Sequence, residues 1–122
     1  MKEYDELVYV LLSSGLSESC NTAINASHLD EFEGKVYVVN NQRVAYMNKM
    51  AMFEARYLID QGKSGKEIKE YLEKTRSECG VYIAVDTLKY LKKGGRVTPA
   101  AAATGTLLNI KPILQIHGCK LA

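Results

Sequence analysis

Three serines and a glycine form the most informative local pattern in the chain. They are Ser13, Ser14, Gly15 and Ser17, and they follow an apolar run that ends at Leu12. Ligands of open α/β sheets bind at the carboxyl ends of the strands, and unpaired N–H groups at the start of a helix attract anions. The pattern therefore predicts a site for a carboxylate or a phosphate. The alternative is purely structural, because serine is also common in turns and at helix caps.

Other side chains in the sequence do not indicate hydrolytic, metal or cofactor chemistry. The serine spacing differs from Gly-x-Ser-x-Gly, so a serine nucleophile is not predicted. The two histidines, His28 and His117, show no metal-ligand spacing. Cys20, Cys79 and Cys119 are odd in number and form no CxxC motif, which predicts reduced thiols rather than a disulfide framework or a zinc site. The sequence therefore predicts neither a metal nor a cofactor.

A basic cluster surrounds two adjacent glycines in the second half of the chain. Lys92 and Lys93 precede Gly94 and Gly95, and Arg96 follows them. The lysines complement the negative end of the preceding helix, whereas Arg96 lies beyond the glycines and is available to meet an anion. The formal net charge is only +2 and there is no broad basic face. No nucleic-acid partner is predicted.

The apolar pattern predicts alternating strands and helices that position these residues. Strands are predicted at 7–12, 36–39, 81–85 and 111–116. The strand at 7–12 is predicted to be covered on both faces, and the strand at 36–39 to run parallel to it. A partner for the strand at 111–116 is predicted to begin at Lys120. Helices are predicted at 16–28, with Ser17 as N-cap, and at 45–59. A third helix is predicted to begin after a capping box at Ser64, and a fourth after an N-cap at Asp86. A further helix is predicted to begin at Thr98-Pro99. This alternation is typical of an α/β protein.

The composition is that of an ordinary folded protein, with 47% hydrophobic and 25% charged residues. A length of 122 residues predicts one small domain or part of a larger one. The longest uncharged run, 97–110, has 14 residues and contains Pro99 and Gly105, so no membrane span is predicted. Acidic residues rather than a basic flank precede the first apolar stretch, which predicts a cytoplasmic protein.

Three segments of the chain together resemble a known family. Residues 13–17 (SSGLS) and 21–23 (NTA) resemble the SSGLSGTYNTA signature of the bacterial DegV family. Residues 85–97 (VDTLKYLKKGGRV) look like the second signature of that family, and residues 107–114 (LLNIKPIL) are similar to the third. The segments occur in the family's order and spacing. The resemblance therefore extends over essentially the whole chain.

The resemblance implies a fatty-acid-binding protein. Members of the family hold one long-chain acyl group in a tunnel, and some present its carboxylate to a separate fatty acid kinase, so the carrier itself is not an enzyme. By this resemblance Ser17 donates to the carboxylate, Ser14 and Gly15 belong to the same loop, and Arg96 lies near the headgroup or at the face shown to the kinase. The implied wall of the acyl tunnel is formed by Leu107, Leu108 and Ile110.

The usual family member has two α/β lobes and more than twice this length. The resemblance therefore implies a partial, parallel-sheet DegV-like α/β fold, in which residues 1–80 are the later part of the first lobe and residues 81–122 the start of the second. The family's Thr-Asp-Ser strand, Thr-Ser-x-Pro segment and distal histidine loop have no counterpart here, and Glu18 stands where the family usually has glycine. A partial fold leaves apolar faces uncovered, which predicts self-association or poor stability in isolation.

Two alternatives remain beside the fatty-acid carrier. Residues 13–17, which we call the serine loop, could hold the phosphoester of an α/β enzyme domain together with Arg96. Alternatively, the truncated chain could bind nothing. The fatty-acid carrier and the phosphoester-binding enzyme differ in the tail of the ligand. A carrier needs a long apolar tunnel, whereas a phosphoester site is short and polar.

Overall fold

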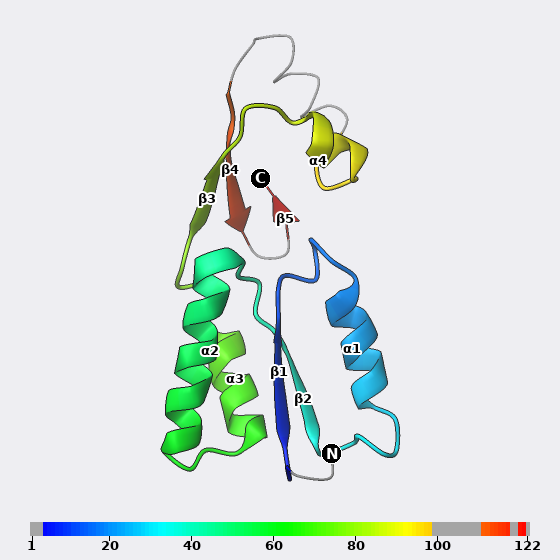
Figure 1. The fold of residues 1–122 in the computed structure, drawn as a ribbon, viewed down its shortest axis with the longest axis vertical. Coiled ribbons are helices and arrows are strands. Elements are labelled where there is room, and N and C mark those ends of the chain that lie inside the picture. The colour runs from blue at the N-terminus through cyan, green and yellow to red at the C-terminus, as the bar shows by residue number, and fades with distance from the viewer. Residues whose placement is uncertain (1–3, 99–110, 118–119, 122) are drawn as a thin grey trace.

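Strands and helices alternate along the chain, which confirms the predicted α/β class. The structure is a computed structural model, and it describes residues 4–98, 111–117 and 120–121. In chain order the elements are β1 (Leu7–Leu11), α1 (Ser19–Ser27), β2 (Val36–Asn40), α2 (Ala45–Asp60), α3 (Gly65–Thr75), β3 (Val81–Ala84), α4 (Lys89–Lys93), β4 (Ile113–His117) and β5 (Lys120–Leu121). Figure 1 shows two groups, one around β1 and β2 and the other around β3, β4 and β5.

The first group is a parallel pair of strands with helices on both sides. β1 and β2 are in register from Leu7 opposite Val36 to Leu11 opposite Asn40. The parallel arrangement is confirmed, and α1 makes the crossover that it requires. In Figure 1, α1 lies on one side of the strand pair, and α2 and α3 lie on the other. Both strands therefore end at the same edge, next to the serine loop.

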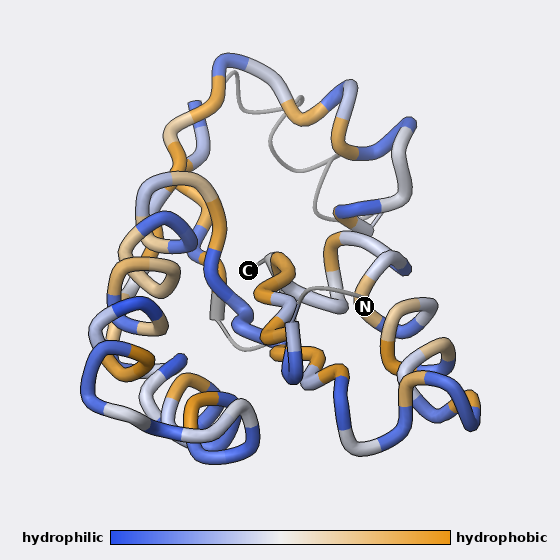
Figure 2. Tube along the Cα trace, turned by 60° about the horizontal axis from the view of Figure 1, so that its bottom comes forward, coloured by the Kyte–Doolittle hydropathy of each residue, from blue (hydrophilic) through white to orange (hydrophobic). Residues whose placement is uncertain are grey.

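The core of this group lies between the strands and the helices α2 and α3. Its buried members are Val39, Ala51, Ala55, Ile68 and Leu72, and Val8, Val10 and Leu58 pack against them. In Figure 2 hydrophobic residues run along these strands and alternate with hydrophilic residues on the helices. Burial of this kind contributes about 25 cal/mol per Å² of apolar surface. The apolar face of each helix therefore fixes its position on the sheet.

The opposite face of β1 departs from the prediction. The continuous apolar run predicted a strand covered on both faces, but Leu7 and Tyr9 are 47% and 46% exposed. Both project to the face on which α1 lies, because side chains alternate along a strand. Helix α1 covers Val38 of β2, which is buried, and leaves these two residues of β1 uncovered.

The start of α3 confirms the predicted capping box. The Ser64 hydroxyl accepts a hydrogen bond from the Glu67 backbone N–H at 3.3 Å, and the Glu67 carboxylate accepts one from the Ser64 N–H at 3.0 Å. These bonds satisfy two of the donors that a helix start leaves unpaired. Helix α3 then buries Ile68 and Leu72 against β2 and α2.

The second group is an antiparallel sheet with the order β3-β4-β5. The predicted partner strand at Lys120 is confirmed as β5, which forms a hairpin with β4. The parallel pairing expected for the fold thus applies to β1 and β2, while β3 pairs with β4 in the antiparallel sense. Leu88 and Leu114 form a small core here, supported by residues that include Val97.

The short helix α4 begins differently from the prediction. Its N-cap is Leu88, with no side-chain cap, and the Thr87 hydroxyl accepts a hydrogen bond from the Lys89 N–H at 3.2 Å. Asp86 does not cap this helix, because its carboxylate forms an ion pair with Lys111 at 2.8 Å. The helix predicted from Thr98-Pro99 lies outside the described residues. Among the described helices, none has the length and apolar character to cross a bilayer.

Candidate functional site

The serine loop forms a tight turn at the carboxyl end of β1. Ser13 is fully buried, and its carbonyl oxygen accepts hydrogen bonds from the N–H groups of Leu16 and Ser17 at 3.0 and 3.2 Å. Its hydroxyl accepts a further bond from the Gly15 N–H at 3.3 Å. Ser13 therefore holds the turn from inside, whereas Ser14 and Ser17 are only partly buried.

Ser17 lies just before α1 rather than at its cap. The prediction that Ser17 is the N-cap is wrong, since the helix begins at Ser19 and its cap residue is Glu18. The Ser17 hydroxyl still accepts a hydrogen bond from the Ser19 N–H at 3.3 Å, and it lies 2.9 Å from the Ser19 hydroxyl. Ser17 thus accepts a hydrogen bond from the N–H group of the first helical residue, although Ser17 itself lies two residues before the helix.

Glu18 puts a negative charge beside this loop. Its carboxylate accepts a hydrogen bond from the Asn21 side-chain amide at 2.9 Å, in an exposed position on the first turn of α1. A bond along the helix surface holds the carboxylate towards Asn21. The acid that distinguishes this chain from the family signature is therefore engaged by its own helix.

Arg96 reaches the same loop from the second group of elements. Its Nε and Nη2 atoms each donate to the carbonyl oxygen of Leu16 at 3.2 Å. Its Nη1 atom donates to the carbonyl oxygen of Gly94. These partners are neutral carbonyl groups, and no carboxylate among the described residues pairs with the guanidinium. The structure thus brings together Arg96 and the serine loop, which the resemblance places near one headgroup.

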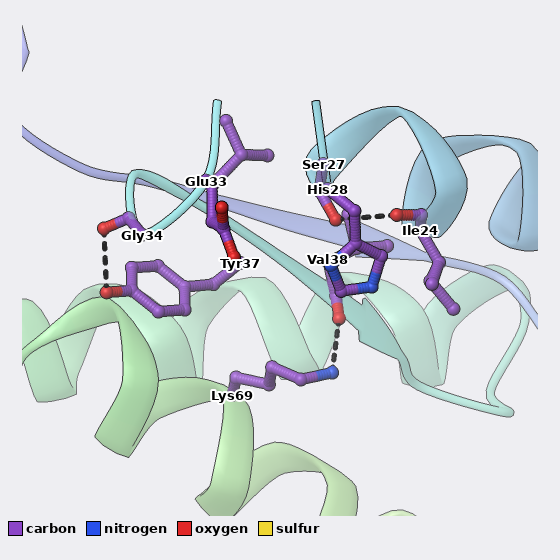
Figure 3. Close-up of a pocket in the computed structure, with 9 residues that line it drawn as sticks. Ile24, Ser27, His28, Glu33, Gly34, Tyr37, Val38 and Lys69 are labelled. Atoms are coloured by element: carbon purple, nitrogen blue, oxygen red, sulfur yellow. Dashed lines mark hydrogen bonds between the residues drawn. The ribbon is translucent and has the colours of Figure 1, made fainter. Parts of the chain in front are cut away.

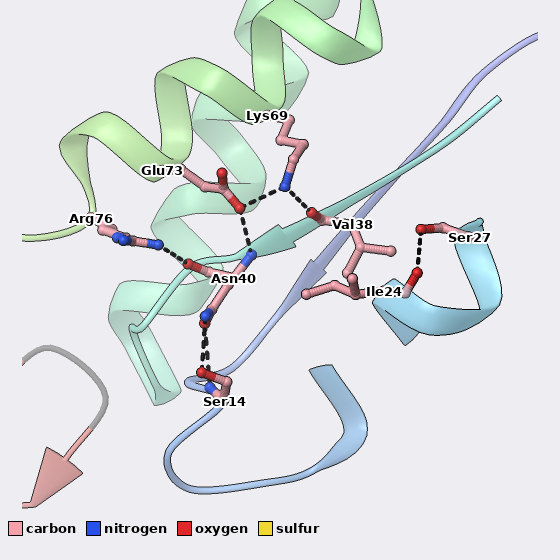
Figure 4. Close-up of polar contacts among 8 residues, drawn as sticks. All are labelled: Ser14, Ile24, Ser27, Val38, Asn40, Lys69, Glu73 and Arg76. Carbon is pink, nitrogen blue, oxygen red and sulfur yellow. Dashed lines mark hydrogen bonds and ion pairs between the residues drawn. The ribbon is translucent and has the colours of Figure 1, made fainter. Parts of the chain in front are cut away.

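Asn40, which the sequence analysis did not identify, anchors the serine loop from the end of β2. Its side-chain Nδ2 donates to the Ser14 hydroxyl at 2.9 Å, and its Oδ1 accepts from the Ser14 N–H at 3.3 Å (Figure 4). The available signal was its position as the polar residue that ends a strand parallel to β1. The register places it opposite Leu11, at the edge where the loop begins.

Helix α3 holds the backbone of Asn40. The Glu73 carboxylate accepts a hydrogen bond from the Asn40 N–H at 3.1 Å, and Arg76 donates to the Asn40 carbonyl at 3.3 Å. Lys69 pairs with Glu73 at 2.7 Å and donates to the carbonyl oxygen of Val38 at 2.5 Å. Figure 4 shows this chain of contacts from α3 across the outer edge of β2 to Ser14.

The segment after β2 is fixed by buried polar groups. Arg43 is 2% exposed, and it bonds to Glu54 of α2 at 3.2 Å and to the Thr75 carbonyl of α3 at 2.8 Å. Asn41 is fully buried and donates to Asn48 at 2.8 Å. Breaking a buried ion pair by removing one partner strongly destabilises a fold. These contacts tie both helices to the end of β2.

Two hollows lie beside β2. A cavity of about 300 Å³ lies at its outer edge, and Figure 3 shows His28 and Lys69 among its lining residues. A more polar cavity of about 250 Å³ lies between the two groups of elements, and it is lined by Gln42, Arg76, Ser77, Cys79, Gly80, Tyr82, Gln115 and Ile116. Among the described residues, no group of three or more His, Cys, Asp and Glu side chains is placed to hold a metal ion. The predicted tunnel residues Leu107, Leu108 and Ile110 lie outside the described part of the chain.

One known protein family matches the whole length of the chain. The model of the DegV family, described as a family of uncharacterised proteins, matches residues 1–122. The chain belongs to the DegV family. A DegV domain-containing protein of Staphylococcus aureus is 31% identical over 118 residues, which are 97% of this chain and 41% of the relative. One from Clostridium acetobutylicum is 35% identical over 114 residues, which are 93% of this chain and 40% of the relative.

Solved DegV structures share the fold. A DegV family protein from Thermus thermophilus, described as binding fatty acid, is 33% identical, with a TM-score of 0.80 over 98% of this chain and 42% of that one. DegV from Bacillus subtilis, described as a fatty acid binding protein, is 30% identical, with a TM-score of 0.75 over 98% of this chain and 43% of that one. The partial DegV fold is therefore confirmed. The chain spans about 41% of the length of the Staphylococcus aureus relative.

Proposed function

We propose that this chain binds a long-chain fatty acid, with the carboxylate at the Ser14–Ser17 loop. The observation that carries the proposal is the position of Arg96, whose guanidinium donates to Leu16 in the middle of that loop. A carboxylate there would meet hydroxyl groups and a cation whose partners among the described residues are neutral. Hydrogen bonds to charged groups contribute about 1.5–3 kcal/mol each, about twice as much as neutral ones.

The proposed residue roles follow from this arrangement. Ser17 and Ser14 donate hydrogen bonds to the carboxylate, Gly15 leaves the loop open to it, and Arg96 supplies the positive charge. The acyl tail runs along a wall that includes Leu107, Leu108 and Ile110, which we assign from the family resemblance. The two fatty-acid-binding DegV proteins from Thermus and Bacillus support this ligand class for the fold.

We propose a carrier rather than an enzyme. Among the described contacts, the hydroxyl groups of the loop bond to backbone N–H groups, to the Asn40 amide and to the Ser19 hydroxyl, and none of these groups is a base. The bound acid is then presented to a separate fatty acid kinase, and Arg96, which is exposed, belongs to the face that the kinase would contact. This partner is inferred from the family resemblance.

We further propose a division into two lobes and association between copies. Residues 1–80 form the later part of the first lobe, and residues 81–122 form the start of the second. An apolar hollow of about 350 Å³ between β1 and α2 is lined by residues that include Met52 and Ile59, and both of these side chains are about half exposed. Exposed apolar surface of this kind favours self-association.

Native mass spectrometry tests the proposed ligand. The purified chain is measured intact, and any lipid is then extracted under denaturing conditions and identified. A C14–C18 acid bound at one per protomer or one per dimer is the expected result. A folded chain that carries no acid, and that gains none when incubated with palmitate, would overturn the proposal. Binding of short phosphoesters without any dependence on chain length would favour the enzyme alternative.

A further inference from the structure

Two groups of Ser19 contact the same hydroxyl oxygen at the start of α1. The Ser17 atom Oγ accepts a hydrogen bond from the Ser19 backbone N–H at 3.3 Å, and it lies 2.9 Å from the Ser19 hydroxyl oxygen. In the contact between the two hydroxyl groups, either oxygen can be the donor. This contact therefore has two possible forms, which differ in where the Ser17 hydrogen points.

A bound carboxylate would select one of these two forms. A carboxylate has acceptor atoms only, whereas a serine hydroxyl has one hydrogen and two lone pairs. When Ser17 donates its hydrogen to the carboxylate, it can only accept from Ser19. Its two lone pairs then take the Ser19 N–H and the Ser19 hydroxyl hydrogen. In the opposite form, Ser17 donates to Ser19 and has no hydrogen left for the ligand.

The surroundings of the pair favour Ser17 as the residue next to the ligand. Ser17 is partly buried and directly follows Leu16, whose carbonyl oxygen accepts two hydrogen bonds from Arg96. Ser19 is exposed on the first turn of α1, and among the described residues its hydroxyl contacts Ser17 alone. A donor that bonds to another donor polarises it, so a hydrogen bond from Ser19 would strengthen the one that Ser17 makes.

We propose that Ser19 is a positioning residue, whose hydroxyl donates to Ser17 and thereby directs the Ser17 hydrogen to the fatty acid carboxylate. This inference rests on the proposed function of the serine loop. Ser19 acts through Ser17, without contact with the ligand. The requirement at position 19 is a hydroxyl group, which threonine also supplies.

A double-mutant cycle on the full chain tests the inference. Affinity for cis-parinaric acid, a fluorescent C18 fatty acid, is measured for the wild type, Ser17→Ala, Ser19→Ala and the double variant. Ser19→Ala is expected to weaken binding about fivefold, the loss of one hydrogen bond between uncharged groups. In the Ser17→Ala background the same substitution is expected to change affinity less than about twofold, because the group it acts on is gone.

The substitution at position 19 leaves the start of the helix in place. The Ser19 N–H still donates to Ser17 after Ser19→Ala, and the Ser19 hydroxyl caps no backbone group of α1. Alanine also has a higher helix propensity than serine. Circular dichroism is therefore expected to show an unchanged fold, so a loss of affinity reports on the hydroxyl group.

A matched pair of variants separates the hydroxyl from the shape of the side chain. Ser19→Thr keeps a hydroxyl and is expected to bind like the wild type, whereas Ser19→Val has nearly the same shape and is expected to bind like Ser19→Ala. Thr22→Val removes a hydroxyl that donates to the Glu18 carbonyl on the same helix, and it should leave affinity unchanged. If Ser19→Ala folds poorly, the threonine and valine variants replace it in the cycle.

The outcomes distinguish this inference from the proposed function. If the folded wild type does not bind cis-parinaric acid, the proposed function fails and the inference fails with it. If the wild type binds and Ser19→Ala binds equally well, the proposed function stands and the role of Ser19 is overturned. The same conclusion follows if Ser19→Ala weakens binding equally with and without Ser17. A larger loss for Ser19→Ala than for Ser17→Ala would place Ser19 itself at the ligand and would also overturn the positioning role.

Discussion

Arg96 and Leu16 are 80 residues apart in sequence, yet two nitrogens of the Arg96 guanidinium donate to the Leu16 carbonyl oxygen at 3.2 Å each. The contact joins the antiparallel group of strands to the loop that ends β1. It places a positive charge beside hydroxyl groups that sit on the other group of elements. A substitution at Arg96 therefore tests both the site and the way it is assembled.

Arg96→Ala is expected to weaken fatty acid binding about tenfold or more, because it removes the cation and the contact to Leu16. Arg96→Lys keeps the charge but loses the planar fork, so an intermediate affinity is expected. Titration with a fluorescent C18 fatty acid measures both. Lys93→Ala, which also removes one exposed positive charge, is the matched control. Equal affinities for Arg96→Ala and Lys93→Ala would show that Arg96 has no special role.

Ser17→Ala is expected to weaken binding by about 1–3 kcal/mol, the cost of losing a hydrogen bond to a charged group. Ser27→Ala, at the other end of α1, removes a hydroxyl that bonds only to the Ile24 carbonyl among its described contacts, and it should leave binding unchanged. The same titration measures both variants. An unchanged affinity for Ser17→Ala would remove Ser17 from the site.

Glu67 makes the stability of α3 depend on pH. Its hydrogen bonds to Lys63, and then to the Ser64 backbone and side chain, lower the pKa of its carboxyl group from 4.5 to about 2. A group whose pKa is lower in the folded state stabilises the fold above its unfolded pKa. Its contribution is then lost as the pH falls from about 4.5 towards about 2.

Chemical unfolding at several pH values measures this contribution. The wild type is expected to be more stable than Glu67→Gln at neutral pH, and the difference should shrink as the pH falls through that range. Glu70→Gln on the same helix provides the control, since no ion pair or hydrogen bond is described for that side chain. A difference between wild type and Glu67→Gln that stays constant with pH would contradict the prediction.

Leu72→Ala is expected to destabilise the chain by about 2–5 kcal/mol, because Leu72 is fully buried and its truncation leaves a cavity in the core. Glu70→Ala, on the exposed side of α3, should change stability by less than about 0.5 kcal/mol. Urea unfolding followed by circular dichroism gives both values. A small effect of Leu72→Ala would mean that α3 does not pack on the sheet as described.

Tyr9→Lys is expected to reduce self-association, because Tyr9 is 46% exposed on β1 and a lysine there opposes pairing between copies. Sedimentation velocity over a range of concentrations measures the effect. Tyr90→Lys changes an exposed tyrosine on α4, away from the parallel strands, and should leave the association unchanged. A wild type that remains monomeric throughout would refute the proposed association itself.

Local signals explain what could be predicted from the sequence. The Ser64 capping box lies within four residues, so the sequence alone predicted the start of α3. The apolar spacing of α2 and the apolar run of β1 are also local patterns, and they predicted these two elements. The parallel pairing of β1 and β2 followed from the helix-length connection between them. The prediction that Asp86 caps α4 was wrong, because the Asp86 carboxylate pairs instead with Lys111, which is distant in sequence.

Long-range contacts explain what was missed. Asn40 lies 26 residues from Ser14, and nothing in the local pattern of β2 indicates that its terminal amide holds another loop. The antiparallel pairing of β3 with β4 joins strands separated by α4 and by residues 99–110. The position of Arg96 beside the serine loop was suggested by family resemblance, since spacing alone cannot bring these segments together.

The contacts of Lys69 and Glu73 limit how the parallel sheet can grow. They occupy the Val38 carbonyl and the Asn40 N–H, which are the groups that another strand would need on the outer edge of β2. The other edge of this strand pair is that of β1, and no strand in the described part of the chain pairs with it. Two copies that pair through their β1 strands would use both open edges at once. Assembly through the parallel strands would therefore stop at a closed dimer, without extending into a fibre.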